Sequence, residues 1–280
     1  PQETMNRAVK RIITLLVWAG IVAYLLWASH LDARKRADTY VRDLHITVRD
    51  SSDTRIIRAE DVRRWIVSAG LSPEGQLFDS VDLMAITRTV AAHDFVQHVK
   101  TSVGLDSVVN VTVRQRIPAL RVIGGGYNFY YTTDGYIVPA NRRSAYYVPV
   151  VTGQFDLPFC PSYSGPLREP TDSTSKKVQE SYRFFHKLIN FVNYIEDDNF
   201  WNSQIVQINV TGRPEPHTEP EVELIPRVGD QVIMLGWLDG YERKLDKLMK
   251  FYRKALPHEG WETWSYIDLR YDGQVVCSRR

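Results

Sequence analysis

The stretch that decides the fold is residues 109–122, VNVTVRQRIPALRV. Its first half alternates valines with polar residues, and an alternation of period two places the valines on one face of a β-strand. Pro118 then interrupts the pattern, and strand-like runs dominate the sequence that follows. The stretch therefore predicts a strand that completes one folded module and, near Pro118, the start of a second.

Residues 44–102 predict the rest of the first module. Leu44, Ile46 and Val48 alternate as in a strand, and residues 95–102 form another strand-like run. Two runs between them show helical spacing: Val62, Trp65, Ile66 and Ala69 in the first, and Leu83, Ile86 and Val90 in the second. Gly70 stands at the C-terminal cap of the first helix, and Ser80 or Asp82 at the N-cap of the second. The order β-α-α-β-β leaves strand edges available, and Trp65 is expected to be mostly buried.

Residues 118–280 predict a mainly antiparallel β-domain with accessory helices. Asp134 and Gly135 indicate the turn of a hairpin over residues 127–138, because Asp-Gly tolerates the positive φ that tight hairpin turns need. Further strands are expected at residues 146–152, 205–210, 221–225, 231–235, 264–271 and 274–278. Residues 154–172 are rich in proline, glycine and serine and predict a long surface loop.

Two helices are expected in this second module. The first begins after Ser173 or Thr174 and carries apolar residues at steps of four and three: Val178, Tyr182, Phe185, Ile189 and Val192. That spacing also suits a coiled coil, but barely two heptads are present, so a core-facing helix is favoured. The second helix, residues 241–255, places apolar side chains on one face: Leu245, Leu248, Met249 and Tyr252.

Residues 12–28, IITLLVWAGIVAYLLWA, form an uncharged apolar run that indicates a membrane-spanning helix. A helix over this run is roughly 25 Å long at about 1.5 Å per residue, and residues up to 31 extend it towards the usual core thickness of about 30 Å. A secretory signal peptide is the alternative, but Leu26 and Trp27 stand where its cleavage site needs small residues. Basic residues flank the run on both sides, so charge does not fix its orientation.

Composition favours a folded globular protein and argues against a nucleic-acid binder. The 35 basic and 33 acidic residues nearly cancel, so no strong global field attracts nucleic acid. With 44% hydrophobic residues, the 280-residue chain can bury one or two cores. Cys160 and Cys277 are too few and too far apart to form a metal site, and one optional disulfide is the most that they could make.

The sequence shows no motif for catalysis, cofactor binding or metal binding. Residues 124–126 are three glycines, but no Lys-Ser/Thr follows them as in a phosphate loop. His93 and His98 are five residues apart and do not share a helical face as paired metal ligands would. Residues 196–198, Glu-Asp-Asp, form the tightest acidic cluster; they end a predicted helix and are interpreted as a solvated loop rather than a metal or acid/base site. A membrane-anchored peptidoglycan enzyme stays open as the enzymatic alternative, because catalytic groups can meet only in space.

Three stretches resemble the FtsQ/DivIB family of bacterial cell-division proteins. Residues 109–122 resemble the family's strand, basic turn and proline at the junction of its POTRA domain and β-domain. Residues 130–153, YYTTDGYIVPANRRSAYYVPVVTG, are similar to its hairpin and following strand. Residues 234–277 match its Leu-Gly strand end, its Lys-Leu-x-x-Leu helix and its final Ile-Asp-Leu-Arg-Tyr strand. The resemblance covers nearly the whole chain, although the chain stops soon after that last strand.

The resemblance implies a non-enzymatic divisome scaffold without cofactors, embedded in the cell inner membrane at the septum. We expect a cytoplasmic tail at residues 1–11, one transmembrane helix at 12–31, a juxtamembrane linker at 32–43, a POTRA-like domain at 44–117 and the β-domain at 118–280. The body would be periplasmic, and its partners would be FtsB-like and FtsL-like single-span division proteins.

The final strand pair, residues 266–278, is the expected docking edge for an FtsB-like partner. Its family-like sequence is IDLRYDGQVV, and an edge strand is a ready template for strand addition. The candidate partner-binding residues are Arg270, Tyr271, Gly273, Gln274, Val275 and Val276. The alternative is that Arg270 pairs within the sheet and Tyr271 packs on the β-domain.

Overall fold

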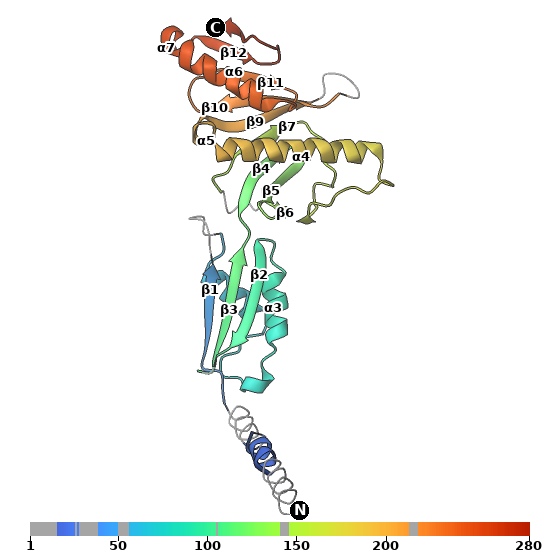
Figure 1. Cartoon of the computed structure of the whole chain (residues 1–280), viewed down its shortest axis with the longest axis vertical. Helices are drawn as coiled ribbons and strands as arrows, with labels where there is room; N and C mark the ends of the chain where they lie inside the picture. Colours follow the sequence, from blue (N-terminus) through green and yellow to red (C-terminus); the bar gives the residue numbers. More distant parts are fainter. Residues whose placement is uncertain are drawn as a thin grey trace, which may run out of the picture. The chain divides into compact units, whose positions relative to one another are not determined.

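The computed structural model of the chain describes residues 16–25, 27, 39–49, 56–104, 106–140, 146–212 and 218–280. The chain divides into two compact units. The first comprises Pro1–Ser51 and Ile57–Gln115, and the second comprises Ser52–Ile56 and Arg116–Arg280 (Figure 1).

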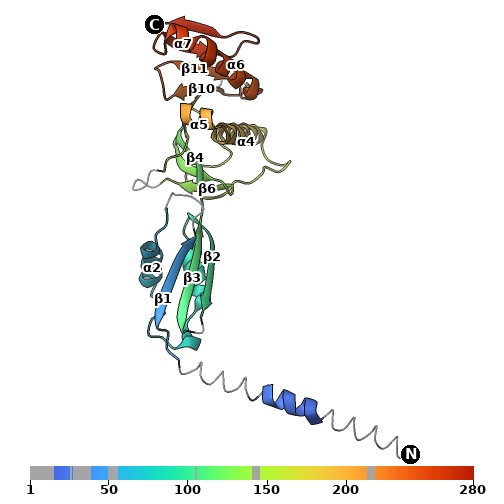
Figure 2. The ribbon, with the colours of Figure 1, turned by 60° about the vertical axis from the view of Figure 1, so that its left-hand side comes forward.

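The first unit is built on a three-stranded sheet in the order β1-β3-β2 (Figure 2). Its strands are β1 (Asp43–Arg49), β2 (Val96–Val103) and β3 (Val108–Gln115). The middle strand, β3, runs parallel to β1 and antiparallel to β2. Val109, Val111 and Val113 are all buried, as the alternation in residues 109–113 predicts.

Two helices and a 3-10 turn complete this unit: α2 (Ala59–Ser68), η1 (Phe78–Ser80) and α3 (Leu83–Ala91). Gly70 has φ 71°, and its N–H donates to Val67 O at 3.0 Å while Leu71 N–H donates to Ile66 O at 3.0 Å, which caps α2. Asp82 is the N-cap of α3, since its Oδ1 accepts from Ala85 N–H at 2.8 Å. The predicted β-α-α-β-β module is confirmed.

Trp65 is partly buried, in agreement with the expectation that most of its ring is covered, whereas Ala69 at the end of the same predicted face is exposed. The Trp65 ring stacks on His93 with 3.6 Å between ring centroids and an interplanar angle of 18°. Val62 and Ile66 are the fully buried residues of α2.

The second unit contains a ten-stranded sheet in the order β13-β12-β11-β10-β9-β7-β4-β5-β6-β8. Its strands are β4 (Pro118–Gly124), β5 (Tyr127–Thr132), β6 (Tyr136–Pro139), β7 (Val150–Gly153), β8 (Gly165–Pro166), β9 (Ile205–Gly212), β10 (Glu221–Pro226), β11 (Val232–Gly236), β12 (Trp264–Asp268) and β13 (Val276–Arg279). The pairs β4-β7, β7-β9 and β11-β12 are parallel, and the other neighbours are antiparallel. A mainly antiparallel sheet is therefore confirmed.

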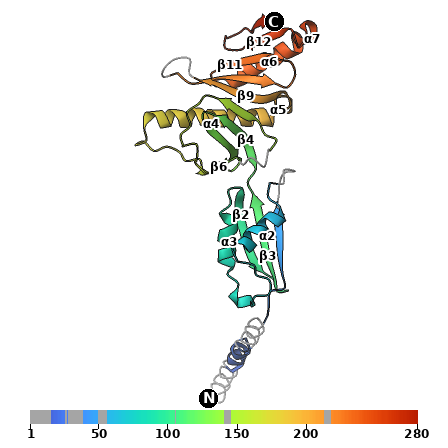
Figure 3. The same ribbon diagram turned by 180° about the vertical axis from the view of Figure 1, so that it is seen from behind.

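Helices α4 (Lys176–Asp197) and α6 (Tyr241–Lys254) cover one face of this sheet, and the short α5 (Asn199–Gln204) and α7 (Leu256–Glu259) follow them in the chain (Figures 1 and 3). Their apolar residues join alternate residues of the strands in one core, which includes Phe185, Val192, Leu245 and Leu248. The core-facing interpretation of α4 is thus confirmed over the coiled coil.

Residues 154–172 form the long, mostly exposed loop that their composition predicts, but apolar side chains attach it to the core. Phe155 and Leu157 are buried, and the Phe159 ring lies 5.4 Å from the ring of Phe129 and 5.9 Å from that of Phe185. The segment also contributes the two-residue strand β8 to the sheet. An aromatic ring packed on the core in this way buries about 150–250 Å². The preceding strand is shorter than predicted, since β7 begins only at Val150.

The described residues include 16–25 and 27 of the apolar run, whereas the rest of that run, the cytoplasmic tail and residues 32–38 of the linker lie outside them. Residues 16–25 are helical. Within the described residues, no helix meets the length and hydrophobicity that crossing a membrane requires. The transmembrane helix at residues 12–31 stays a prediction.

The burial of Trp65 and of its neighbour Ile66 can be measured. Ile66 is fully buried, so Ile66→Ala is expected to cost about 2–5 kcal/mol of unfolding free energy. Trp65→Ala should cost about 3–5 kcal/mol, because it removes a mostly covered aromatic ring and its stack on His93. Equilibrium urea unfolding followed by circular dichroism measures both. An unchanged unfolding midpoint for Trp65→Ala would contradict the covered position of its ring.

Candidate functional site

Strand β13 forms one end of the ten-stranded sheet (Figure 3). It pairs antiparallel with β12, so that Tyr266 faces Ser278, Ile267 faces Cys277 and Asp268 faces Val276. In the described part of the chain no strand pairs with its other side, which we call the open edge. Unpaired N–H and C=O groups along such an edge are a template for another strand.

Two backbone hydrogen bonds establish which groups face the open edge. Arg280 N–H donates to Thr263 O at 3.2 Å, and Leu269 N–H donates to Met234 O at 2.9 Å on the far side of β12. Because successive N–H groups of a strand alternate in direction, Val276 and Ser278 direct theirs towards β12. The N–H and C=O groups of Cys277 and Arg279 therefore point to the open edge.

The opposite end of the sheet is protected. Strand β8 contains only Gly165 and Pro166, and proline has no backbone N–H to offer an added strand. The chain on either side is tied back, since Leu167 N–H donates to Gly135 O at 2.8 Å and Ser164 Oγ donates to Ile137 O at 3.5 Å. The two ends of the sheet thus differ in their capacity for strand addition.

The six candidate partner-binding residues lie together at one corner of the second unit. Val276 begins β13, whereas Arg270, Tyr271, Gly273, Gln274 and Val275 form the connection from β12 to β13. Gly273 has φ 73°, a conformation that favours glycine and turns the chain back. Tyr271 is 50% exposed, and Val276 is partly exposed.

Arg270 is held within the protein by two carboxylates. Its guanidinium donates to Asp268, with Nη2 at 2.7 Å from Oδ2 and Nε at 3.1 Å from Oδ1, and Nη1 lies 3.3 Å from Glu221 Oε2. Asp268 is only 3% exposed. Burial alone would raise the pKa of Asp268, but the hydrogen bonds from Arg270 outweigh it and hold that pKa below its ordinary value.

Lys247 of α6 fixes the connection between the last two strands. Its Nζ donates to Leu269 O at 2.9 Å and to Gln274 O at 3.2 Å, and it also contacts Tyr271 O. One ammonium therefore bridges carbonyl groups from both sides of the turn. The shape of the connection is set before any partner binds.

Trp237 is a member of this corner that the sequence reasoning missed. It is 48% exposed and directly follows β11. Gly236 packs so closely on Arg270 that an added Cβ would lie 2.7 Å from Arg270 Cγ, which places Trp237 one residue from the predicted site. Exposed tryptophan and tyrosine are the residue types that carry most binding energy at protein interfaces. The Leu-Gly at the strand end was the available signal, because the residue after it leaves the sheet.

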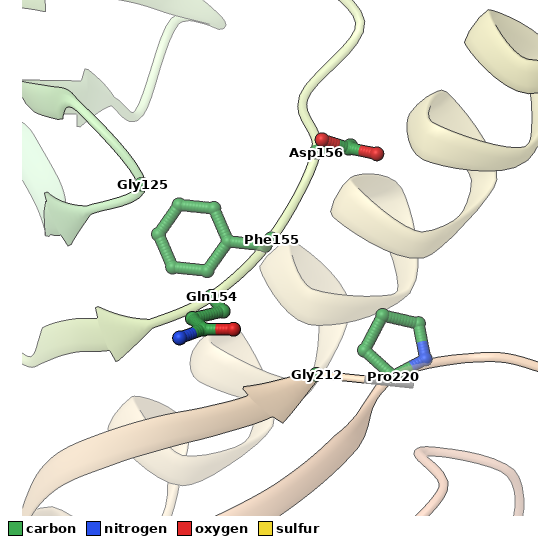
Figure 4. Close-up of a pocket in the computed structure, with 6 residues that line it drawn as sticks. All are labelled: Gly125, Gln154, Phe155, Asp156, Gly212 and Pro220. Carbon is green, nitrogen blue, oxygen red and sulfur yellow. The ribbon is translucent and has the colours of Figure 1, made fainter. Parts of the chain in front are cut away.

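The glycine run and the two cysteines occupy defined positions in the fold. The glycines of residues 124–126 turn the chain from β4 to β5, and Gly125 lines a hollow of about 350 Å³ with Gln154, Phe155, Asp156, Gly212 and Pro220 (Figure 4). Asp156 is ion-paired to Lys177 at 3.0 Å. Across the described ranges, no cluster of three or more His, Cys, Asp or Glu residues could hold a metal ion. Cys160 and Cys277 are both free thiols, so the optional disulfide is not formed.

The acidic cluster of residues 196–198 ends a helix, as predicted, and joins it directly to α5 without an intervening loop. Helix α4 ends at Asp197, and Asp198 caps α5 because its Oδ1 accepts from Phe200 N–H at 2.8 Å and Trp201 N–H at 3.0 Å. Glu196 is half-buried, and burial, with a smaller effect of the Asp197 charge, raises its pKa to about 7.

Glu196 makes stability depend on pH in a defined direction. The carboxyl binds its proton more tightly in the folded state, so its contribution to stability falls as pH rises from about 4.5 to about 7. Glu196→Gln removes this penalty. We expect the variant to be about 1 kcal/mol more stable at pH 8, a value discounted for the exposed part of the side chain.

At pH 4.5 the Glu196→Gln variant and the parent should unfold alike, in urea titrations followed by circular dichroism. Glu262→Gln, at an exposed position, is the control and should change little at either pH. A Glu196→Gln variant that is no more stable than the parent at pH 8 would show that Glu196 is ordinarily solvated.

Arg270 is expected to contribute to the stability of the folded second unit. Arg270→Ala leaves Asp268 as a buried charge without its main partner, which should cost about 3 kcal/mol of unfolding free energy. The double variant Arg270→Ala/Asp268→Asn should recover part of that loss in the same urea titration. Loss below about 0.5 kcal/mol in the single variant would contradict the pairing, since that is the range of an ordinary surface substitution.

Comparisons with known proteins agree with the fold of both units. Residues 117–278 match the family described as "FtsQ/DivIB, C-terminal related", and residues 39–114 match the POTRA-like domain. One relative is "Cell division protein FtsQ" of Rhodothermus marinus (strain ATCC 43812 / DSM 4252 / R-10), which is 26% identical over 214 residues. That alignment covers 74% of this chain and 69% of the relative. The POTRA-like unit and the matched second unit together show that the chain belongs to the FtsQ/DivIB family of cell-division proteins.

Proposed function

We propose that this cell-division protein is a non-enzymatic scaffold that binds other single-span division proteins by strand addition at the open edge of β13. The observation that carries the proposal is the contrast between the two ends of the sheet. One end is β8, which has two residues, one of them a proline. The other end is β13, in which the backbone N–H and C=O groups of Cys277 and Arg279 point outward. A partner strand would continue the sheet at the second end.

The proposed partners are FtsB-like and FtsL-like proteins, and the proposed location is the septal region of the cell inner membrane. The predicted span at residues 12–31 would hold the N-terminus in the cytoplasm and the two units in the periplasm. The POTRA-like unit has edge strands of its own, β1 and β2, which supports a scaffold that holds more than one partner.

The proposal divides the six candidate residues by role. In the segment that begins at Gln274, outward backbone N–H and C=O groups would form hydrogen bonds with the partner strand. The Tyr271 side chain offers an exposed apolar face beside that edge. Arg270 is a positioning residue in this scheme, because its guanidinium is engaged by Asp268 and Glu221. Trp237 adds a second exposed ring at the same corner.

Proline substitution distinguishes the open edge from the paired side of β13. Cys277→Pro removes an outward N–H, so it should weaken binding of the FtsB-like partner by about tenfold or more, whereas Cys277→Ala should bind normally. Val276→Pro is unsuitable, because Val276 directs its N–H towards β12 and the change would disrupt the sheet. Tyr271→Ala and Trp237→Ala are expected to cost about 1–3 kcal/mol of binding free energy each.

The binding measurement uses the full chain in nanodiscs and a titrated partner, after circular dichroism shows each variant to be folded. Tyr147→Ala is the control, because Tyr147 is a highly exposed aromatic residue elsewhere in the unit. Unchanged affinity for Cys277→Pro, Tyr271→Ala and Trp237→Ala together would place the docking site elsewhere. Peptidoglycan hydrolysis by the same full chain would favour the enzymatic alternative instead.

A further inference from the structure

Tyr40 and Leu77 form an exposed apolar pair where the chain enters the POTRA-like unit. They face each other across an isolated antiparallel bridge, so their side chains lie on the same side of it. Tyr40 is 62% exposed and Leu77 is 41% exposed. We call these two residues the Tyr40–Leu77 pair.

The backbone around this pair is fixed on both sides. Phe78 N–H donates to Thr39 O at 2.9 Å, Val41 N–H donates to Gln76 O at 2.9 Å, and Gly75 N–H donates to Val41 O at 3.0 Å. The short ladder holds the first residues of the unit against the loop that precedes η1. The exposure of the pair is therefore a property of the folded unit and does not arise from a loose end.

The sequence places this pair close to the predicted membrane span. Only residues 32–39 separate Tyr40 from the predicted membrane span, which ends at residue 31. Eight residues reach at most roughly 28 Å when fully extended and about 12 Å as a helix. The headgroup region of a bilayer begins directly outside its hydrocarbon core of about 30 Å. A chain anchored by that span carries the pair within reach of the lipid surface.

We propose that the Tyr40–Leu77 pair rests on the lipid surface beside the anchor and limits the tilt of the POTRA-like unit. The inference rests on the proposed membrane anchor. A tyrosine with an apolar ring and a polar tip suits the membrane interface, and leucine adds apolar area. Two side chains suffice because the anchor makes the contact intramolecular, which gives it a high effective concentration.

The contact is apolar in character rather than electrostatic. The exposed charged residues nearest the pair in sequence are Arg42 and Asp79, one of each sign. Among the described residues beside the pair the two signs balance, whereas the basic residues Arg34, Lys35 and Arg36 precede it in the sequence. The apolar contact of the pair itself does not depend on those charges, so it should persist in phosphatidylcholine vesicles and at high salt.

The test uses the full chain in phosphatidylcholine vesicles, with Cys160→Ser and Cys277→Ser to remove the native thiols. A single cysteine replaces Leu77 and carries an environment-sensitive fluorophore. The matched control carries it at Ala91, an exposed residue in the last turn of α3. A quencher attached near the lipid headgroups should quench the label at position 77 at least about twice as strongly as that at position 91.

A second variant shows whether the tyrosine holds the contact. Tyr40→Asp should reduce quenching at position 77 to the level of position 91, whereas Tyr40→Phe should preserve it. Flotation of the vesicles reports the anchor separately. If the chain fails to float, the anchor is wrong and the inference falls with it. If it floats but positions 77 and 91 are quenched alike, only the contact of the pair is overturned.

Discussion

A ten-stranded sheet that does not close must end in two strands, and each end leaves backbone N–H and C=O groups without partners in the sheet. The two end strands of the second unit differ in how many unpaired backbone groups they expose. At β8 the strand is two residues long and contains Pro166, so it offers almost nothing to an added chain. Strand β13 has four residues and contains no proline, and the backbone N–H and C=O groups of its Cys277 and Arg279 point outward. The proposed function depends on this asymmetry more than on any single side chain.

The corner beside β13 is stabilised by charged side chains that are already paired within the second unit. Asp268 would be a costly buried carboxylate without Arg270, and Arg270 in turn spans to Glu221 on β10. Lys247 is similarly occupied by carbonyl groups of the connection to β13. Both cations are thus paired within the unit, so in the proposed docking the exposed rings of Tyr271 and Trp237 would provide the recognition. A connection that is already ordered also saves a partner part of the entropy cost of binding.

Local pattern predicted most of the fold, because alternation and helical spacing are properties of neighbouring residues. The buried valines of β3 and the caps at Gly70 and Asp82 follow from such spacing. Long-range facts did not follow. Arg270 pairs within the sheet, which was the alternative to partner binding, and its partner Asp268 is a near neighbour in sequence. Its second partner, Glu221, lies 49 residues away and could not be identified from local pattern. Composition likewise did not show that Phe155 and Leu157 of the proline-rich loop are buried, and helical spacing did not show that Ala69 is exposed.

Hydrogen-bond free energies limit how much of the partner's binding free energy the backbone of β13 can supply. The two outward residues of β13 offer four main-chain hydrogen bonds, which contribute about 2–6 kcal/mol at the usual net value for each bond. A micromolar complex requires about 8 kcal/mol, and association itself carries a further entropy cost. Strand addition alone therefore gives a weak and unselective contact. The difference must come from side chains beside the edge, and an exposed tyrosine and tryptophan at one preorganised corner provide apolar area of the required size. Backbone bonds would then fix the direction and register of the partner strand, and the two rings would determine which protein supplies it.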